Sequence, residues 1–150
     1  MEIANRLIVL WRMQKVGSKL YEELSVKCRY KGLKDFLQER ASVKSKFAQS
    51  LEPHILVASK EQHRFRFEYP TSYPTPPTIY DNGSKARFLE EEIMEYSISH
   101  QKQSIDSYRS ELIAFDKAPR IREILSKQLK IMVNGLHILY FIDESLTDQL

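Results

Sequence analysis

The sequence predicts an all-α protein, a single-domain four-helix bundle made of two repeated helix pairs. Apolar residues recur at helical spacing through most of the 150-residue chain. The segment that begins at Gln14 returns 87 residues later at Gln101, and the segment that begins at Leu33 returns 88 residues later at Ile121. A proline-rich stretch separates the two copies. The expected organisation is a helix pair at 3–52, a crossover at 53–82 and a helix pair at 84–142.

The first helix pair is predicted from an apolar stripe with alternating steps of four and three residues. Gly32 marks the break between its two helices. The second helix is expected to run from Leu33 to Leu51 and to end at Pro53, because proline lacks the amide hydrogen that a helix interior uses. The stripe of the first helix consists of Ile3, Leu7, Leu10, Gln14, Gly17, Tyr21, Leu24 and Cys28.

The crossover loses helical periodicity. Residues 54–58 and 64–69 each look like strands, the second by strict alternation, and the polar residues 59–63 could close a hairpin between them. The prolines that follow favour extended backbone. The sequence therefore leaves open whether the crossover holds a β-hairpin or stays extended.

The second helix pair has its own start and stop signals. Ser84 is a candidate N-cap for a helix that runs to about Phe115, and Pro119 lies at the start of the next helix. Asp143 ends the periodic region, so the last residues are expected to form a loose tail.

Composition and charge limit the class of protein. The hydrophobic content of 42% and the charged content of 29% are typical of soluble proteins, and no apolar run approaches the roughly 20 residues that span a bilayer. The single Cys28 and the lack of a signal-peptide pattern predict a cytoplasmic location. Residues 1–52 hold 11 Lys+Arg and 6 Asp+Glu, whereas residues 83–150 hold 9 and 11. This asymmetry favours attraction between the pairs or between copies of the chain.

The first helix pair resembles that of the rubrerythrin and ferritin-like superfamily. The shared features are Tyr21, seven residues after the ligand position at Gln14, a leucine-containing start of the second helix, and an Ala-x-x-ligand-x-x-ligand-Ala pattern at 41–48. The resemblance is greatest to small bacterial proteins of unknown function that keep the bundle and vary its site. It implies a ferritin-like up-down bundle with one long crossover, which allows the second and third helices to be parallel neighbours across the bundle.

The resemblance also implies where a di-iron site would lie. Members with such a site carry a Glu on the first and third helices and Glu-x-x-His on the second and fourth. None of the matching residues is a competent metal ligand, and nearby Glu39, His100 and His137 form no Glu-x-x-His pair. We therefore expect a degenerate site with no cofactor. The matching positions are Gln14, Lys44, Phe47, Gln101, Met132 and Gly135.

A core polar layer is the expected replacement. Gln14 and Gln101 would face each other and hydrogen-bond across the core, with Lys44 taking the place of the metal. The competing interpretation places Lys44 at the rim of the bundle, where its ammonium reaches water. Tyr21 and Tyr108 belong to the same layer, either as neighbours of the site or as ordinary core aromatics.

The crossover also contains a possible partner surface. Cations and aromatic rings interleave there, as they do on single-strand nucleic-acid platforms, although a strand with one packed face shows the same alternation. The residues are Arg64, Phe65, Arg66, Phe67, Tyr69 and Tyr73.

These observations favour a non-enzymatic structural or protein-interaction bundle that has lost its di-iron site. One alternative is a di-metal oxidase or iron-binding protein with displaced ligands. Another is a binder of nucleic acid or membrane surfaces that uses the basic turn 27–34 with Arg64 and Arg66. Apolar residues beyond one stripe, at Ile8, Val9 and Trp11, predict a homodimer or another protein partner, with nucleic acid less favoured and no membrane span.

Overall fold

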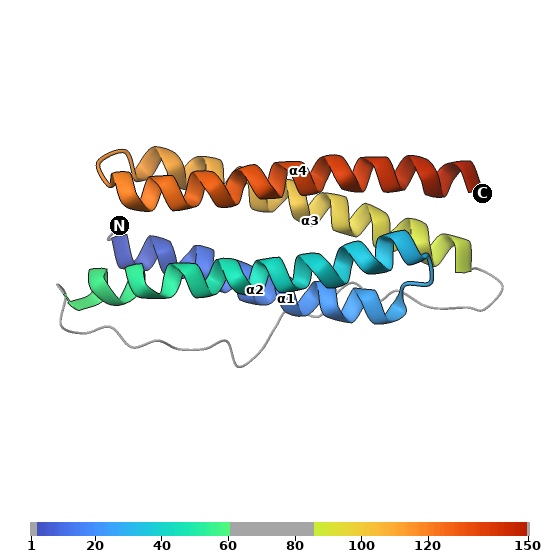
Figure 1. Ribbon diagram of the computed structural model, residues 1–150, viewed down its shortest axis with the longest axis horizontal. Coiled ribbons are helices and arrows are strands. Elements are labelled where there is room, and N and C mark those ends of the chain that lie inside the picture. The colour runs from blue at the N-terminus through green and yellow to red at the C-terminus, as the bar shows by residue number, and fades with distance from the viewer. Residues whose placement is uncertain (1–2, 61–85, 150) are drawn as a thin grey trace.

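A computed structural model describes residues 3–60 and 86–149, and within these residues the chain is entirely helical apart from two turns (Figure 1). This confirms the predicted all-α class and the number of long helices. The helices are α1 (Ile3–Lys27), α2 (Lys31–Lys60), α3 (Ala86–Ala114) and α4 (Pro119–Gln149).

The four helices form a bundle in which α1 and α4 run in one direction and α2 and α3 run in the other (Figure 1). Helix α1 packs against α2, α3 against α4, α1 against α3 and α2 against α4. The helices α2 and α3 are therefore parallel, as expected, and lie across the bundle from each other at opposite corners rather than packing side by side. None of the four helices has the length and apolarity that a bilayer span requires.

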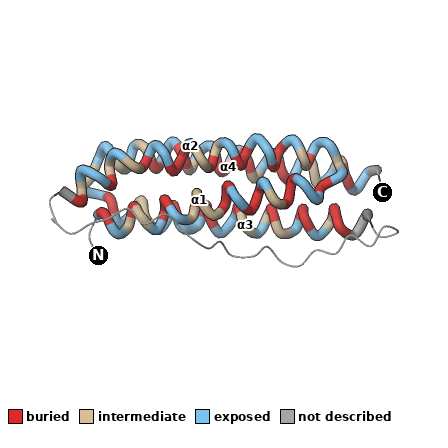
Figure 2. The backbone as a smooth tube through the Cα atoms, turned by 90° about the horizontal axis from the view of Figure 1, so that it is seen from below, coloured by how far each residue is buried: buried red, intermediate tan, exposed pale blue. Residues whose placement is uncertain are grey.

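The core consists of two apolar halves with polar residues between them. One half surrounds Tyr21, Leu37 and Ile93, and the other surrounds Trp11, Leu51 and Tyr108. Figure 2 shows that buried residues follow the sides on which the helices face each other. Burial of these stripes, at about 25 cal/mol per Å² of apolar surface, is the main force that holds the helices together.

Glu90 fastens α3 to the turn between α1 and α2. Its Oε1 accepts a hydrogen bond from the backbone amide of Arg29 at 2.6 Å, and its Oε2 accepts one from the amide of Tyr30 at 3.2 Å. The Cys28 thiol donates to the same Oε2 at 3.0 Å. The carboxylate also lies at the amino-terminal end of α2, where the helix dipole favours a negative charge.

The predicted end of the second helix at Pro53 is wrong. Helix α2 continues through this proline to Lys60, so residues 54–58 are helical and not a strand. Leu51, Ile55 and Ser59 are all buried at four-residue spacing. Burial of this extra helical stripe offsets the hydrogen bond that Pro53 cannot donate.

Two further boundaries differ from the prediction. Helix α4 continues to Gln149, because Leu146 packs in the core and holds the segment that we expected to be a loose tail. Gly32 lies within α2, which begins at Lys31. The proposed second strand at 64–69 and the proposed N-cap Ser84 lie outside the described residues.

Replacement of Glu90 by glutamine is expected to lower the free energy of unfolding by about 1–3 kcal/mol, because a neutral amide accepts these buried hydrogen bonds less well than a carboxylate. Urea denaturation measures the loss. Glu92→Gln, an exposed change on the same helix, is the matched control. Equal stability of the two variants would contradict a fastening role for Glu90.

Candidate functional site

A layer of buried polar side chains separates the two apolar halves of the core. All four helices contribute to it, and each member is at most 9% exposed except His100, which is partly buried. We call this set the polar layer. Its members are Gln14, Ser18, Tyr21, Arg40, Lys44, Ser97, His100, Gln101, Ser104, Tyr108 and Gln128.

Two glutamine–tyrosine hydrogen bonds cross between the helix pairs. The Nε2 of Gln14 donates to the hydroxyl of Tyr108 at 2.9 Å, and the hydroxyl of Tyr21 donates to Oε1 of Gln101 at 3.0 Å. In each repeat the tyrosine follows the glutamine by seven residues. Each helix pair therefore supplies one glutamine and one tyrosine, and each of these bonds to its counterpart on the other helix pair. We had expected the two amides to hydrogen-bond directly to each other. Instead, each amide bonds to a tyrosine of the other helix pair.

These bonds continue into α2 and α4. The Tyr108 hydroxyl donates to Oε1 of Gln128 at 2.6 Å, and Nε2 of Gln128 donates to the carbonyl of Phe47 at 3.3 Å. On the other side, Nε2 of Gln101 donates to the carbonyl of Met132 at 2.9 Å. Because buried polar groups are costly without partners, this network fixes the register of the four helices.

Lys44 lies inside the layer and is only 3% exposed. It therefore does not reach water from the rim, which was the competing interpretation. Its Nζ lies 5.0 Å from the ring centroid of Tyr21, and it makes no ion pair with any carboxylate of the described residues. Burial, together with the charge of Arg40, lowers the pKa of Lys44 to about 7.

Arg40 lies one helical turn before Lys44 and is 8% exposed. Its Nη1 donates to the carbonyl of Ile131 at 3.3 Å, and its guanidinium carbon lies 5.4 Å from the ring centroid of Phe36. Its buried Nε has no hydrogen-bond partner among the described residues. An arginine side chain stays protonated in proteins, so this charge persists at all relevant pH values.

His100 lies beside Lys44, on α3. Its ring centroid is 5.4 Å from that of Tyr21, and its Nδ1 is buried without a partner among the described residues. Burial and the charge of Lys44 lower the pKa of His100 to about 4, so its imidazole is neutral at pH 7. Burial also raises the pKa values of the Tyr21 and Tyr108 hydroxyls, which therefore remain protonated.

The structure brings five of the predicted site residues into one layer: Gln14, Tyr21, Lys44, Gln101 and Tyr108. The sequence-based prediction missed Arg40, Gln128 and the role of His100. The repeat could have found two of them, because Arg40 and Gln128 are related by the same offset of 88 residues as Leu33 and Ile121.

The remaining degenerate positions also surround the layer. Phe47 and Met132 are buried, and the Sδ of Met132 accepts from Nε2 of Gln14 at 3.7 Å. Gly135 leaves room for the amide of Gln101 and the guanidinium of Arg40, which would lie 3.0 Å and 3.3 Å from an added Cβ. Within residues 3–60 and 86–149, no group of three or more His, Cys, Asp or Glu side chains could hold a metal ion.

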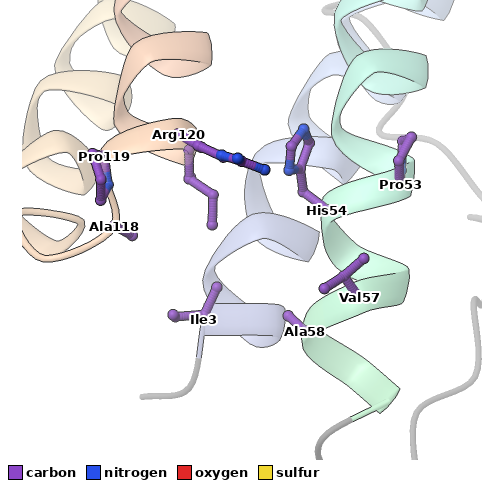
Figure 3. Close-up of a pocket in the computed structure, with 9 residues that line it drawn as sticks. Ile3, Pro53, His54, Val57, Ala58, Ala118, Pro119 and Arg120 are labelled. Carbon is purple, nitrogen blue, oxygen red and sulfur yellow. The ribbon is translucent and has the colours of Figure 1, made fainter.

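An open pocket of about 500 Å³ lies at one end of the bundle, away from the polar layer (Figure 3). It is formed by the start of α1, the second half of α2 and the turn before α4. His54 and Arg120 point toward each other across it, and its other lining residues are apolar. It offers volume but no nucleophile paired with a base. The candidate surface from Arg64 to Tyr73 lies outside the described residues.

Comparison with known proteins gives no match: no protein-family model, no curated protein and no solved structure is significantly similar to this chain. The function must therefore be inferred from the residues and geometry of the bundle itself.

Replacement of Lys44 by methionine is expected to remove a pH dependence of stability between pH 7 and 9. The pKa of Lys44 is lowered from 10.5 to about 7 in the folded state, so the unfolded chain binds more protons in this window and stability rises with pH. The slope is up to about 1.4 kcal/mol per pH unit.

Urea denaturation at several pH values and low salt measures this slope. Lys44→Met should be flat between pH 7 and 9 and more stable than the native protein at pH 7. The control Lys46→Met, an exposed change on the same helix, should keep the native slope. An unchanged slope in Lys44→Met would mean that Lys44 is not the titrating group.

Proposed function

We propose that this chain is a ferritin-like bundle without a di-iron site, and that it acts as a non-enzymatic, self-associating scaffold. The observation that carries this proposal is the pair of crossed glutamine–tyrosine bonds, 2.9 Å and 3.0 Å long, at the positions where the resemblance puts carboxylate ligands. An amide has no negative charge with which to balance a bound cation.

The arrangement of the helices supports this proposal. The contacts of α1 with α3 and of α2 with α4, together with the shared direction of α2 and α3, are what one long crossover between two helix pairs produces. The protonated form of Lys44 adds a positive charge at the centre of the bundle, which disfavours a metal cation at the same position. Its neutral form supplies no negative charge to balance a cation. The polar layer then acts as a device that sets helix register.

A surface of α4 supports the interaction role. Ile131, Ile138 and Phe141 are 40%, 43% and 71% exposed and follow one another at spacings of seven and three residues, so they lie along one side of the helix. An apolar stripe on the outside of a bundle is typical of an interface. Of the α1 residues that suggested an interface, Trp11 is fully buried, whereas Val9 is 56% exposed.

The charges on α4 favour a second copy of the chain as the partner. Residues 120–130 carry four Lys or Arg and one Glu, whereas residues 143–148 carry three acidic residues and no basic ones. Two α4 helices packed antiparallel about a twofold axis would join their apolar stripes and place each basic half against an acidic half. We propose this antiparallel α4 dimer.

Metal analysis tests the loss of the di-iron site. Untagged protein grown with added iron and zinc should contain only substoichiometric metal by inductively coupled plasma mass spectrometry. About two metal ions per chain, the complement of a di-iron bundle, would contradict the proposal and favour displaced ligands.

A variant that restores ligands provides the matched test. Gln14→Glu, Lys44→Glu and Gln101→Glu combined with Phe47→His supply three carboxylates and one imidazole, which suit divalent iron or cobalt. If the ferritin-like correspondence holds, this variant should bind metal that the native protein does not bind. A helical, cooperatively unfolding variant that binds no metal would show that these positions do not correspond to a metal site.

Sedimentation equilibrium tests the α4 dimer. Phe141→Ser should raise the dissociation constant about tenfold or more, because loss of a central aromatic residue usually costs more than 1.4 kcal/mol. The control Ile113→Ser removes an 80% exposed side chain from α3 and should leave association unchanged.

Charge reversal tests the antiparallel orientation. Lys127→Glu with Lys130→Glu should weaken the dimer, and addition of Glu144→Lys with Asp148→Lys to the same chain should restore it. A native protein that sediments as a monomer at all concentrations would contradict the dimer. A dimer that tolerates both Phe141→Ser and the reversed charges would show that it uses another surface.

A further inference from the structure

The polar layer contains two basic side chains and no acidic one. Arg40 and Lys44 are four residues apart on α2, a spacing that puts them side by side on one face of the helix. Neither makes an ion pair with a carboxylate of the described residues. A buried charge without a counter-charge is costly, and two like charges at this spacing repel each other.

The layer also holds basic donors that lack an acceptor. Arg40 Nε is buried without a partner among the described residues, and Lys44 Nζ has only its contact with the Tyr21 ring. The buried unpaired groups beside them are the Gln14 Oε1 and the Nδ1 of the neutral His100, which donates or accepts according to its tautomer. Neither group carries a negative charge, so the layer lacks an anionic acceptor for its two basic side chains.

Two glycines let these groups pack closely against the backbones of α1 and α4. A Cβ on Gly17 would lie 3.0 Å from Lys44 Cδ and 3.1 Å from His100 Cε1, so these two side chains meet at the same point of α1. A Cβ on Gly135 would lie 3.3 Å from the guanidinium carbon of Arg40. Lys44 and His100 therefore lie against α1, and Arg40 lies against α4, at positions where these helices carry no side chain.

We infer that the polar layer binds a small monovalent anion, of halide or formate size, between Arg40 and Lys44 and beside His100. The anion supplies the missing counter-charge and accepts hydrogen bonds from the side chains that lack acceptors. Arg40 keeps 8% exposure, which gives the layer a contact with solvent. This inference goes beyond the proposed scaffold function and does not depend on an ancestral metal site.

Anion binding is coupled to the protonation of Lys44. The titratable and charged groups that the structure places around Lys44 are Tyr21 on α1, Arg40 on α2 and His100 on α3. A nearby anion favours the charged ammonium and raises the pKa of Lys44 from about 7. Binding should therefore be tighter at pH 6.5 than at pH 9.

Thermal unfolding of the full chain tests the inference. The protein is first held in gluconate, a larger anion that serves as the reference. Chloride or formate then replaces the gluconate stepwise at constant ionic strength and pH 6.5. The melting temperature should rise by about 3 °C with saturating dependence on the small anion, and by less at pH 9. Lys44→Met and Arg40→Met should each lose the rise, whereas Lys46→Met should keep it.

Bromide locates the anion directly. Crystals of the native protein soaked in sodium bromide should give an anomalous difference peak between Arg40 and Lys44, and crystals of Lys44→Met should lack this peak. The inference is overturned if the melting temperature does not respond to chloride or formate. It is equally overturned if Lys44→Met keeps the native response, or if bromide binds only at the surface as an adventitious ion.

Discussion

The crossed hydrogen bonds between Gln14 and Tyr108 and between Tyr21 and Gln101 are the constraint on which the rest of the bundle depends. Apolar packing on either side of this layer tolerates small sliding movements, because one leucine can replace another as a neighbour. A buried amide has no such freedom, since a shift of one turn would leave it without a partner. The layer therefore converts a generally attractive set of helix faces into one specific alignment of four helices.

Charge gives the same layer a second property. Metal-binding bundles of this shape place negative ligands around positive ions, whereas this layer places amides and phenols around basic side chains. Arg40 cannot lose its proton, so its permanent charge lowers the pKa of the neighbouring Lys44. The outer face of α4 differs from this layer, because most of its charged side chains are exposed to water, with basic residues concentrated at 120–130 and acidic residues at 143–148.

The sequence predicted the four helices because their apolar stripes span many turns, and local periodicity is a strong signal over such lengths. It also predicted that Gln14, Lys44 and Gln101 belong together, because the repeat relates Gln14 to Gln101 and the ferritin-like resemblance puts Lys44 beside them. It failed at Pro53, where burial of Ile55 and Ser59 outweighs a local helix-breaking signal. Arg40 was missed because a basic residue on a helix usually lies in water, and only tertiary contacts show that this one is buried.

The crossed bonds also make the two helix pairs mutually complementary, since each pair offers what the other accepts. The same bonds would form if the first pair of one chain met the second pair of another chain. Pairing of the two helix pairs within one chain is favoured over pairing between chains because the connecting residues 61–85 keep the two helix pairs at a high effective concentration. The length of that connection therefore sets the balance between a closed bundle and exchange of helix pairs between molecules.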